Sequence, residues 1–192
     1  GSRLWMLFAV ASLGDGTMVE YCVYVSDRKH AEEELRESEA RLKGQKEAFE
    51  AAVGGAPLEA CLDVLIRTVS ERAGGVRAAF YLVDGDGTCL HPVSTAGGMP
   101  EAYTRQVDGF RIGLDSLACG LAAASGSPVL TRDVFEEPLW RPWLHLAREF
   151  DFRGCWSFPI ETHAGKPVGT FAMYHRRPRE ATPRELSLAG AV

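Results

Sequence analysis

The sequence predicts an α+β fold in which helices flank a central antiparallel sheet. Apolar residues recur with helical spacing over residues 58–69, and residues 76–83 are apolar at both parities, which is typical of a strand covered on both faces. Two further apolar strands, 155–160 and 168–175, are separated by a short turn segment at 163–166, so we expect them to pair. A chain of 192 residues has room for one full domain and a smaller piece.

The composition is that of an ordinary globular protein, with 46% hydrophobic and 24% charged residues. The formal net charge of −5 lacks the basic excess typical of proteins that bind nucleic acid or anionic membranes. The longest apolar runs, such as residues 78–83, are far shorter than a membrane-spanning helix. We therefore expect a cytoplasmic chain that contacts neither nucleic acid nor membrane.

The five cysteines are spread along the chain without close pairs, which fits a reducing compartment better than a disulfide framework. No CxxC motif or Cys/His pair at zinc-finger spacing is present, so the sequence predicts no metal site. We expect most of these cysteines to be small core residues. They are Cys22, Cys61, Cys89, Cys119 and Cys155.

Residues 1–26 are predicted to contain a hairpin of two strands. Residues 13–17 supply the turn, with an Asp-Gly pair at its centre, and residues 18–25 are rich in β-branched and aromatic side chains. Because a lone two-stranded hairpin is marginal in water, we expect this piece to belong to a preceding sheet.

Residues 27–53 are predicted to form an amphipathic connector helix. Leu35, Leu42 and Phe49 recur every seven residues and form one apolar column. We expect this column to be the seam of a parallel dimer, and the alternative is a solvated linker helix without a partner. A second, weaker column that would tolerate a change of register or rotation runs beside it: Ala31, Ser38, Gln45 and Ala52.

A second domain is predicted over residues 57–192. Asp115 or Ser116 is expected to cap a small-residue helix that Gly126 ends. The other elements expected between its first and last strands are a turn or helix at 101–106, the capped helix at 117–124, an edge strand at 128–130 and a helix at 143–150.

A strong helix start lies near the C-terminus of the chain. Thr182 is expected to be the N-cap, Pro183 the first helical residue, and Glu185 the partner of a capping box. The chain stops at Val192, where such a helix would be too short to be stable alone, so we expect it to continue in a longer protein.

The order of these elements resembles the GAF fold over about residues 57–192. The segments that carry the resemblance are 119–123 (CGLAA), 126–130 (GSPVL), 133–134 (DV), 138–140 (PLW), 155–160 (CWSFPI) and 165–174 (GKPVGTFAMY). The preceding residues resemble the C-terminal hairpin of a PAS domain, and residues 25–32 (VSDRKHAE) resemble the start of the connector that follows PAS domains.

The resemblance implies a regulatory module rather than an enzyme. PAS–GAF order is typical of bacterial sensor histidine kinases, so we expect a homodimer, joined through the connector and terminal helices, that passes a conformational signal to a downstream output domain in cis. A small-ligand sensor that controls a diguanylate cyclase remains an alternative. No catalytic residue is expected in this chain, and the parent protein is expected to be a histidine kinase.

By the same resemblance, a ligand pocket would lie between the sheet and the irregular middle segment. Indoles, one arginine and a hydroxyl would suit an amphipathic small molecule, anionic if Arg111 takes part. The alternative is that the aromatic residues simply fill the core. The candidate lining residues are Phe110, Arg111, Cys119, Trp140, Trp143, Trp156 and Ser157.

Specific ligands of this fold can be compared with the residues present. Bilin-binding members attach their chromophore through a Cys that is followed by His, but here Gly120 follows Cys119 and Trp156 follows Cys155. No clear axial ligand for haem is found, so we expect no cofactor beyond an unidentified small molecule. Free methionine-sulfoxide reductases share the fold, and Cys119 resembles their reactive cysteine. The second cysteine of that family, which would lie shortly before Arg111, is absent here. A thiol enzyme of this kind is nevertheless kept as an alternative.

Overall fold

A computed structural model describes residues 6–12, 14, 18–24, 26–183 and 185–186. The chain divides into two compact units, Gly1–Lys46 and Glu47–Val192. Helix α1 (Ser26–Val53) is 28 residues long and contains the division between the units. Within the described residues, no helix is long and apolar enough to cross a bilayer.

The first unit contains an antiparallel hairpin. Strand β1 (Met6–Ser12) pairs with β2 (Met18–Tyr24) in a register that runs from Met6 opposite Tyr24 to Ser12 opposite Met18. The predicted turn at 13–17 lies outside the described residues except for Gly14. The origin of this hairpin in a PAS domain stays a prediction.

The second unit is built on a six-stranded sheet in the order β5-β4-β3-β8-β7-β6, and every neighbouring pair is antiparallel. This arrangement confirms the α+β fold with a central antiparallel sheet. The strands are β3 (Arg77–Val83), β4 (Cys89–Ala96), β5 (Phe110–Arg111), β6 (Val129–Thr131), β7 (Gly154–Glu161) and β8 (Pro167–His175).

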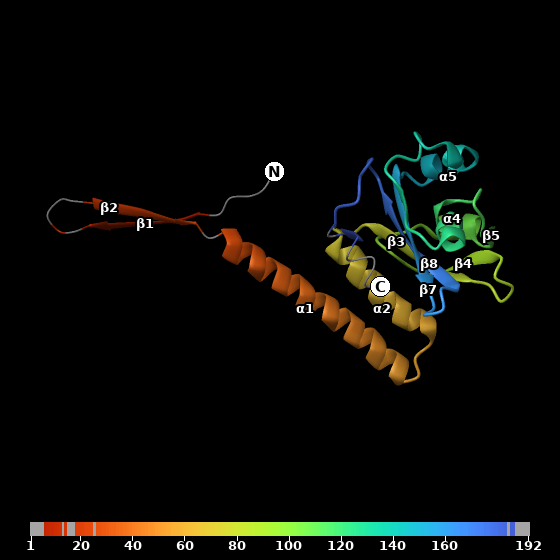
Figure 1. Cartoon of the computed structure of the whole chain (residues 1–192), viewed down its shortest axis with the longest axis horizontal. Helices are drawn as coiled ribbons and strands as arrows, with labels where there is room; N and C mark the ends of the chain where they lie inside the picture. Colours follow the sequence, from red (N-terminus) through yellow and green to blue (C-terminus); the bar gives the residue numbers. More distant parts are fainter. Residues whose placement is uncertain (1–5, 13, 15–17, 25, 184, 187–192) are drawn as a thin grey trace. The chain divides into compact units, whose positions relative to one another are not determined.

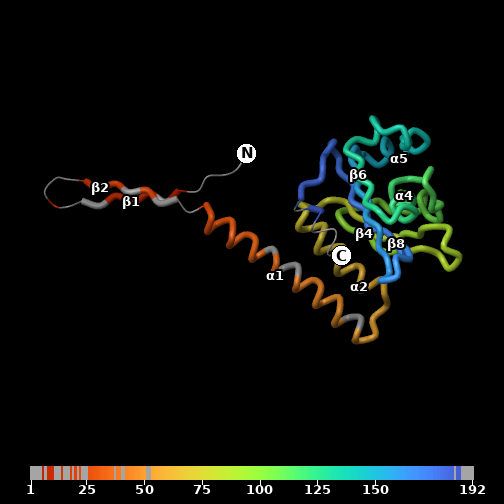
Figure 2. The backbone as a smooth tube through the Cα atoms, in the orientation of Figure 1, coloured from red at the N-terminus to blue at the C-terminus, as the bar shows by residue number. Residues whose placement is uncertain are grey.

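Helices flank this sheet on both sides. The segment between β6 and β7, which carries α5, forms a lobe at one end of the sheet (Figure 2). The predicted helix at 143–150 is confirmed as α5 at Leu144–Glu149, and it directly follows a 3-10 helix that contains Pro142. The helices of the second unit are α2 (Leu58–Arg72), α3 (Glu101–Val107), α4 (Ala118–Ser125), the 3-10 helix η1 (Pro138–Trp143) and α5 (Leu144–Glu149).

The two faces of the sheet have separate cores, and α2 and α4 lie on opposite sides of it (Figure 1). On the α2 side, Ile66 and Val69 pack against alternate residues of the central strands, among them Phe80 and Phe171. On the other side, α3, α4 and α5 cover the remaining positions of the same strands. Coverage on both faces explains why these strands are apolar at both parities.

The start of α4 differs from the prediction. Neither Asp115 nor Ser116 caps it, because Leu117 occupies the N-cap position and no side chain bonds the first turn. The hydroxyl of Ser116 donates instead to the backbone carbonyl of Arg111. The predicted end is confirmed, since Gly126 adopts the left-handed conformation with φ of 63° and its N–H bonds to Ala122.

Candidate functional site

A small cavity lies inside the second unit, between the sheet and helices α3 and α4. Its volume is about 10 Å³, which is near the minimum for a single water molecule. Strands β3, β7 and β8 contribute side chains to its floor. The lining residues are Tyr81, Tyr103, Phe110, Leu117, Ala118, Cys119, Trp140, Cys155 and Tyr174.

Three tyrosines meet at this cavity from distant parts of the chain. The hydroxyls of Tyr81 and Tyr174 are 2.8 Å apart and share a hydrogen bond, and Tyr103 packs edge-on against Tyr174 with ring centroids 5.3 Å apart. Burial raises the pKa of each hydroxyl well above 10, so all three stay neutral. A neutral hydroxyl cluster in an apolar core favours one fixed side-chain arrangement.

The two cysteines of the cavity are buried thiols. Burial raises the pKa of Cys119, although hydroxyls that face it, those of Ser157, Thr170 and Tyr174, oppose the rise. The pKa of Cys155 is raised further, by burial and then by the neighbouring Cys119. Cys119 therefore lacks the lowered pKa that a reactive thiolate needs, and thiol chemistry at this position is disfavoured. No group of metal-binding side chains is found in the described part of the chain.

Several of the sequence-predicted residues do gather on this side of the sheet. Phe110, Cys119 and Trp140 line the cavity. Trp143 packs at the border of the same core, and Ser157 is fully buried on this face beneath Cys119.

Two of the predicted residues lie elsewhere. Trp156 is fully buried on the opposite face, in the core that α2 covers. This follows from strand geometry, because adjacent residues of β7 point to opposite faces, so Trp156 and Ser157 cannot share a pocket. The side chain of Arg111 is exposed and does not line the cavity.

On its own face, Trp156 connects the sheet to the helical residues that directly follow Thr182. Its indole Nε1 donates to the backbone carbonyl of Arg179 at 3.2 Å, and the Arg179 guanidinium lies 5.7 Å from the indole centroid. Arg179 also pairs with the carboxylate of Glu185. Glu185 accepts from the Thr182 N–H at 3.0 Å, and its own N–H donates to the Thr182 hydroxyl at 3.3 Å. The predicted capping box is thus confirmed. We call Trp156, Arg179, Thr182 and Glu185 the exit anchor.

His175 completes the surroundings of Trp156. The two rings are 4.1 Å apart, and the His175 Nε2 is buried without a hydrogen-bond partner in the described residues. Burial and then the positive charge of Arg179 lower the pKa of His175 to about 4, while Glu185 opposes the shift. His175 is therefore neutral at physiological pH.

Sequence reasoning missed the tyrosine cluster at the cavity. Tyr81 lies opposite Thr170 and Tyr174 lies opposite Arg77 on the paired strands β3 and β8, so the two hydroxyls meet only because the side chains lean toward each other. Tyr103 comes from α3, which the sequence indicated only as a short helix or turn. The one available signal was strand alternation. Tyr174 and Thr170 are four residues apart on the same strand, so they lie on the same face, the one toward Cys119.

The comparison with protein families identifies the second unit. A family model described as GAF domain matches residues 55–192, which is most of the chain. The chain belongs to the GAF domain family. This GAF module thus includes α2, the six-stranded sheet, the cavity and the exit anchor.

Relatives of this GAF module occur in proteins of different function. The Methyl sulfide methyltransferase-associated sensor of Methanosarcina acetivorans is 24% identical over 151 residues, and the match covers 79% of this chain but 15% of that protein. The match therefore spans a small part of the curated relative.

Solved structures share the fold at low sequence identity. A domain from a protein described as a two-component sensor histidine kinase of Sinorhizobium meliloti superposes with a TM-score of 0.56 and 22% identity, covering 69% of this chain and 83% of that one. The free methionine-R-sulfoxide reductase of Neisseria meningitidis gives a TM-score of 0.61 and 20% identity, covering 81% and 84%. At these identities the likeness concerns the fold alone.

Proposed function

We propose that this GAF module relays a conformational signal in a bacterial sensor histidine kinase, from PAS and GAF domains to an output domain that follows the C-terminal helix. The observation that carries the proposal is the exit anchor. It joins strand β7, through Trp156, to the first helical turn after Thr182. The Sinorhizobium domain described above supports the choice of a kinase as the parent protein.

The exit anchor has the features of a two-state connection. Arg179 is held by three different contacts: its carbonyl by Trp156, its guanidinium by Glu185, and its N–H by the carbonyl of Arg132 at 3.0 Å. A shift of β7 would change the Trp156 bond and the position of the guanidinium together. Because Glu185 belongs to the capping box, loss of the Arg179 pair would also weaken the helix start.

We propose that the signal enters through a homodimeric seam on α1. Leu35, Leu42 and Phe49 are 61%, 58% and 68% exposed, although large apolar side chains gain free energy from burial. Their spacing of seven residues is that of a coiled-coil position. A parallel dimer through this column, together with the terminal helices, would connect two copies at both ends of the GAF module.

The alternatives differ in output and in chemistry. A diguanylate cyclase output is compatible with the same relay, and the identity of the domain that follows in the full protein would decide between the two. A methionine-sulfoxide reductase is disfavoured, since burial raises the pKa of Cys119 and the thiol is only 3% exposed. We accordingly propose no catalytic residue within this chain.

The relay is tested by autophosphorylation of the full-length protein with Arg179→Gln. Arg177→Gln is the matched control, because it removes the same charge two residues away and outside the exit anchor. A coupling free energy of about 0.5–2 kcal/mol would change the rate by about 2- to 30-fold in the first variant only. Equal rates in both variants and the wild type would contradict the relay, and no phosphorylation by the wild type would contradict the kinase assignment.

A further inference from the structure

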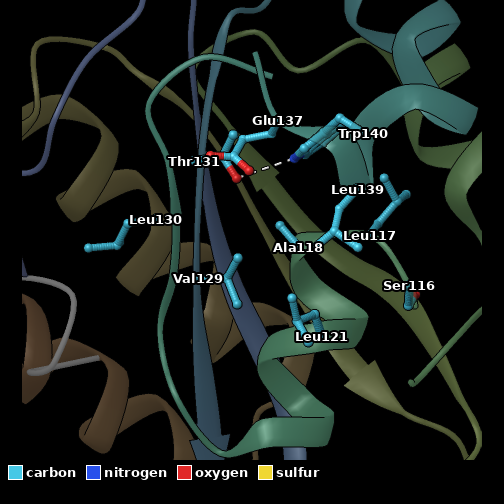
Figure 3. A pocket seen from close by; sticks show the side chains of 10 residues that line it. All are labelled: Ser116, Leu117, Ala118, Leu121, Val129, Leu130, Thr131, Glu137, Leu139 and Trp140. Carbon is cyan, nitrogen blue, oxygen red and sulfur yellow. Dashed lines mark hydrogen bonds between the residues drawn. The ribbon is translucent and has the colours of Figure 1, made fainter. Parts of the chain in front are cut away.

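A second hollow lies at the start of α4, between this helix, the edge strand β6 and the 3-10 helix η1. It is an open groove of about 120 Å³, distinct in position from the interior cavity although Leu117, Ala118 and Trp140 contribute to both. Figure 3 shows the side chains that surround it. The lining residues are Ser116, Leu117, Ala118, Leu121, Val129, Leu130, Thr131, Glu137, Leu139 and Trp140.

Most of the groove wall is apolar. Leu117 and Leu121 come from the start of α4, Val129 from β6, and Leu139 from the 3-10 turn, where it is 46% exposed. An apolar cavity of about 150 Å³ can hold benzene, so this groove has room for a branched alkyl group of four or five carbons. The apolar wall predicts that the body of a ligand would be a hydrocarbon group.

One end of the groove is polar and acidic. Figure 3 shows the carboxylate of Glu137 beside the hydroxyl of Thr131 at this end. The indole Nε1 of Trp140 donates to the Thr131 Oγ1 at 3.2 Å, and this bond holds the hydroxyl in place. No hydrogen bond or ion pair to the Glu137 side chain is found among the described residues, so its charge is available.

The neighbouring acidic residues are already neutralised. Asp133 is bonded to the guanidinium of Arg153, and Glu136 pairs with Arg132 at 2.9 Å. No arginine or lysine lines the groove. The field at its polar end is therefore set by the Glu137 carboxylate, which favours a cation and disfavours an anion.

We infer that this groove binds a small amphipathic cation, with a branched alkyl group against Leu117, Leu121 and Val129 and an ammonium group on Glu137. The ammonium would donate hydrogen bonds to the Glu137 carboxylate and to Thr131 Oγ1, which keeps a lone pair beside the Trp140 bond. This inference replaces the anionic ligand that the sequence suggested, because Arg111 does not line either hollow.

The inference is independent of the relay. A relay through the exit anchor needs no ligand, and the groove lies on the face of the sheet opposite to Trp156. Failure to bind would leave the kinase experiment unaffected, and failure of the relay would leave the groove unchanged.

The test is titration of the ¹⁵N-labelled chain with isobutylammonium chloride, followed by the Trp140 indole N–H resonance. Isobutanol and isobutyrate are the neutral and anionic probes of similar shape. We expect isobutylammonium to shift this resonance in a saturable way. Its affinity should be at least tenfold weaker in Glu137→Gln, because a charge-assisted hydrogen bond is lost, and about unchanged in Glu136→Gln.

Three outcomes would overturn the inference. They are equal affinity of isobutanol or isobutyrate, equal affinity in the Glu137→Gln variant, and no saturable shift up to about 100 mM, a range sufficient for a ligand of five heavy atoms. Glu137 is exposed, so its variant is expected to fold, and an otherwise unchanged amide spectrum confirms this in the same experiment.

Discussion

The indole of Trp156 donates a hydrogen bond to the backbone carbonyl of Arg179, 23 residues later in the chain. Trp156 lies in the buried centre of β7, whereas Arg179 lies in the segment that leads to the helix start at Thr182. The fully buried side chain of Trp156 thus holds the backbone of Arg179, while the guanidinium of Arg179 pairs with Glu185.

The Arg179→Gln substitution should lower the free energy of unfolding by about 1 kcal/mol. It removes the ion pair with Glu185 and the contact of the guanidinium with the Trp156 ring. Because the Arg179 side chain is 47% exposed, solvent screens the pair and keeps the loss modest. Urea unfolding of the chain measures the change. An Arg177→Gln control that loses as much would show that net charge, and not the exit anchor, is responsible.

Stability should fall on acidification between pH 6.5 and about pH 4 because of His175. The folded state lowers its pKa from 6.5 to about 4, so in this interval the unfolded chain binds more protons and unfolding becomes easier as the pH falls. At pH 5 the His175 contribution amounts to a loss of about 2 kcal/mol relative to neutral pH. Urea unfolding at the two pH values gives the difference.

The His175→Phe variant is the control for this dependence. Phenylalanine can keep the contact with Trp156, and the Nε2 that it removes has no hydrogen-bond partner in the described structure. The charged groups that act on His175 are Arg179 and Glu185. The lowered pKa of Glu185 affects stability only below its ordinary value of 4.5. A variant with the same slope between pH 6.5 and 5 would exclude His175 as the cause.

Local sequence rules predicted the elements whose signals lie within a few residues. The helix from Leu58 was predicted from its apolar stripe, and the capping box of Thr182 and Glu185 from a spacing of three residues. The assignment of Ser116 as a cap was wrong because a nearby carbonyl, that of Arg111, competes for its hydroxyl. A sequence pattern does not reveal such a partner across a turn.

The candidate site was harder to predict than the fold. Both faces of β7 are covered, so its residues are apolar at both parities and the pattern alone does not assign Trp156 to a face. The grouping of Tyr81, Tyr103 and Tyr174 depends on strand register and on the position of α3. Glu137 belongs to no sequence motif, and only the fold places it at the end of an apolar groove.

Leu35→Glu combined with Leu42→Glu should convert a dimer of the chain into a monomer. Each substitution places a charge in the proposed apolar column of α1, where both leucines are exposed in a single chain. Sedimentation velocity measures the change. Lys29→Glu with Arg36→Glu is the control, since it adds the same two acidic residues seven positions apart but outside both columns. A dimer that survives in the leucine variant would place the interface elsewhere.

Gly120→Ala should destabilise the GAF module by about 1–3 kcal/mol, because a Cβ at this position would overlap its neighbours. It would lie 2.3 Å from the Ser116 Oγ and 2.4 Å from the Arg111 carbonyl oxygen. Gly85→Ala is the control, as its Cβ would meet nothing within 4 Å. Thermal unfolding of both variants gives the comparison. Equal midpoints would mean that residues 111–116 move to make room for the Cβ without a loss of stability.

Amide hydrogen exchange at the start of the C-terminal helix tests the relay most directly. In the wild type, the Glu185 N–H bonds to the Thr182 hydroxyl, and the Leu186 N–H bonds to the Thr182 carbonyl at 3.0 Å. The relay predicts that Trp156→Phe, which removes the bond to Arg179, accelerates exchange at Glu185 and Leu186 more than in β4. No acceleration at these two amides, or an equal acceleration in β4, would contradict it.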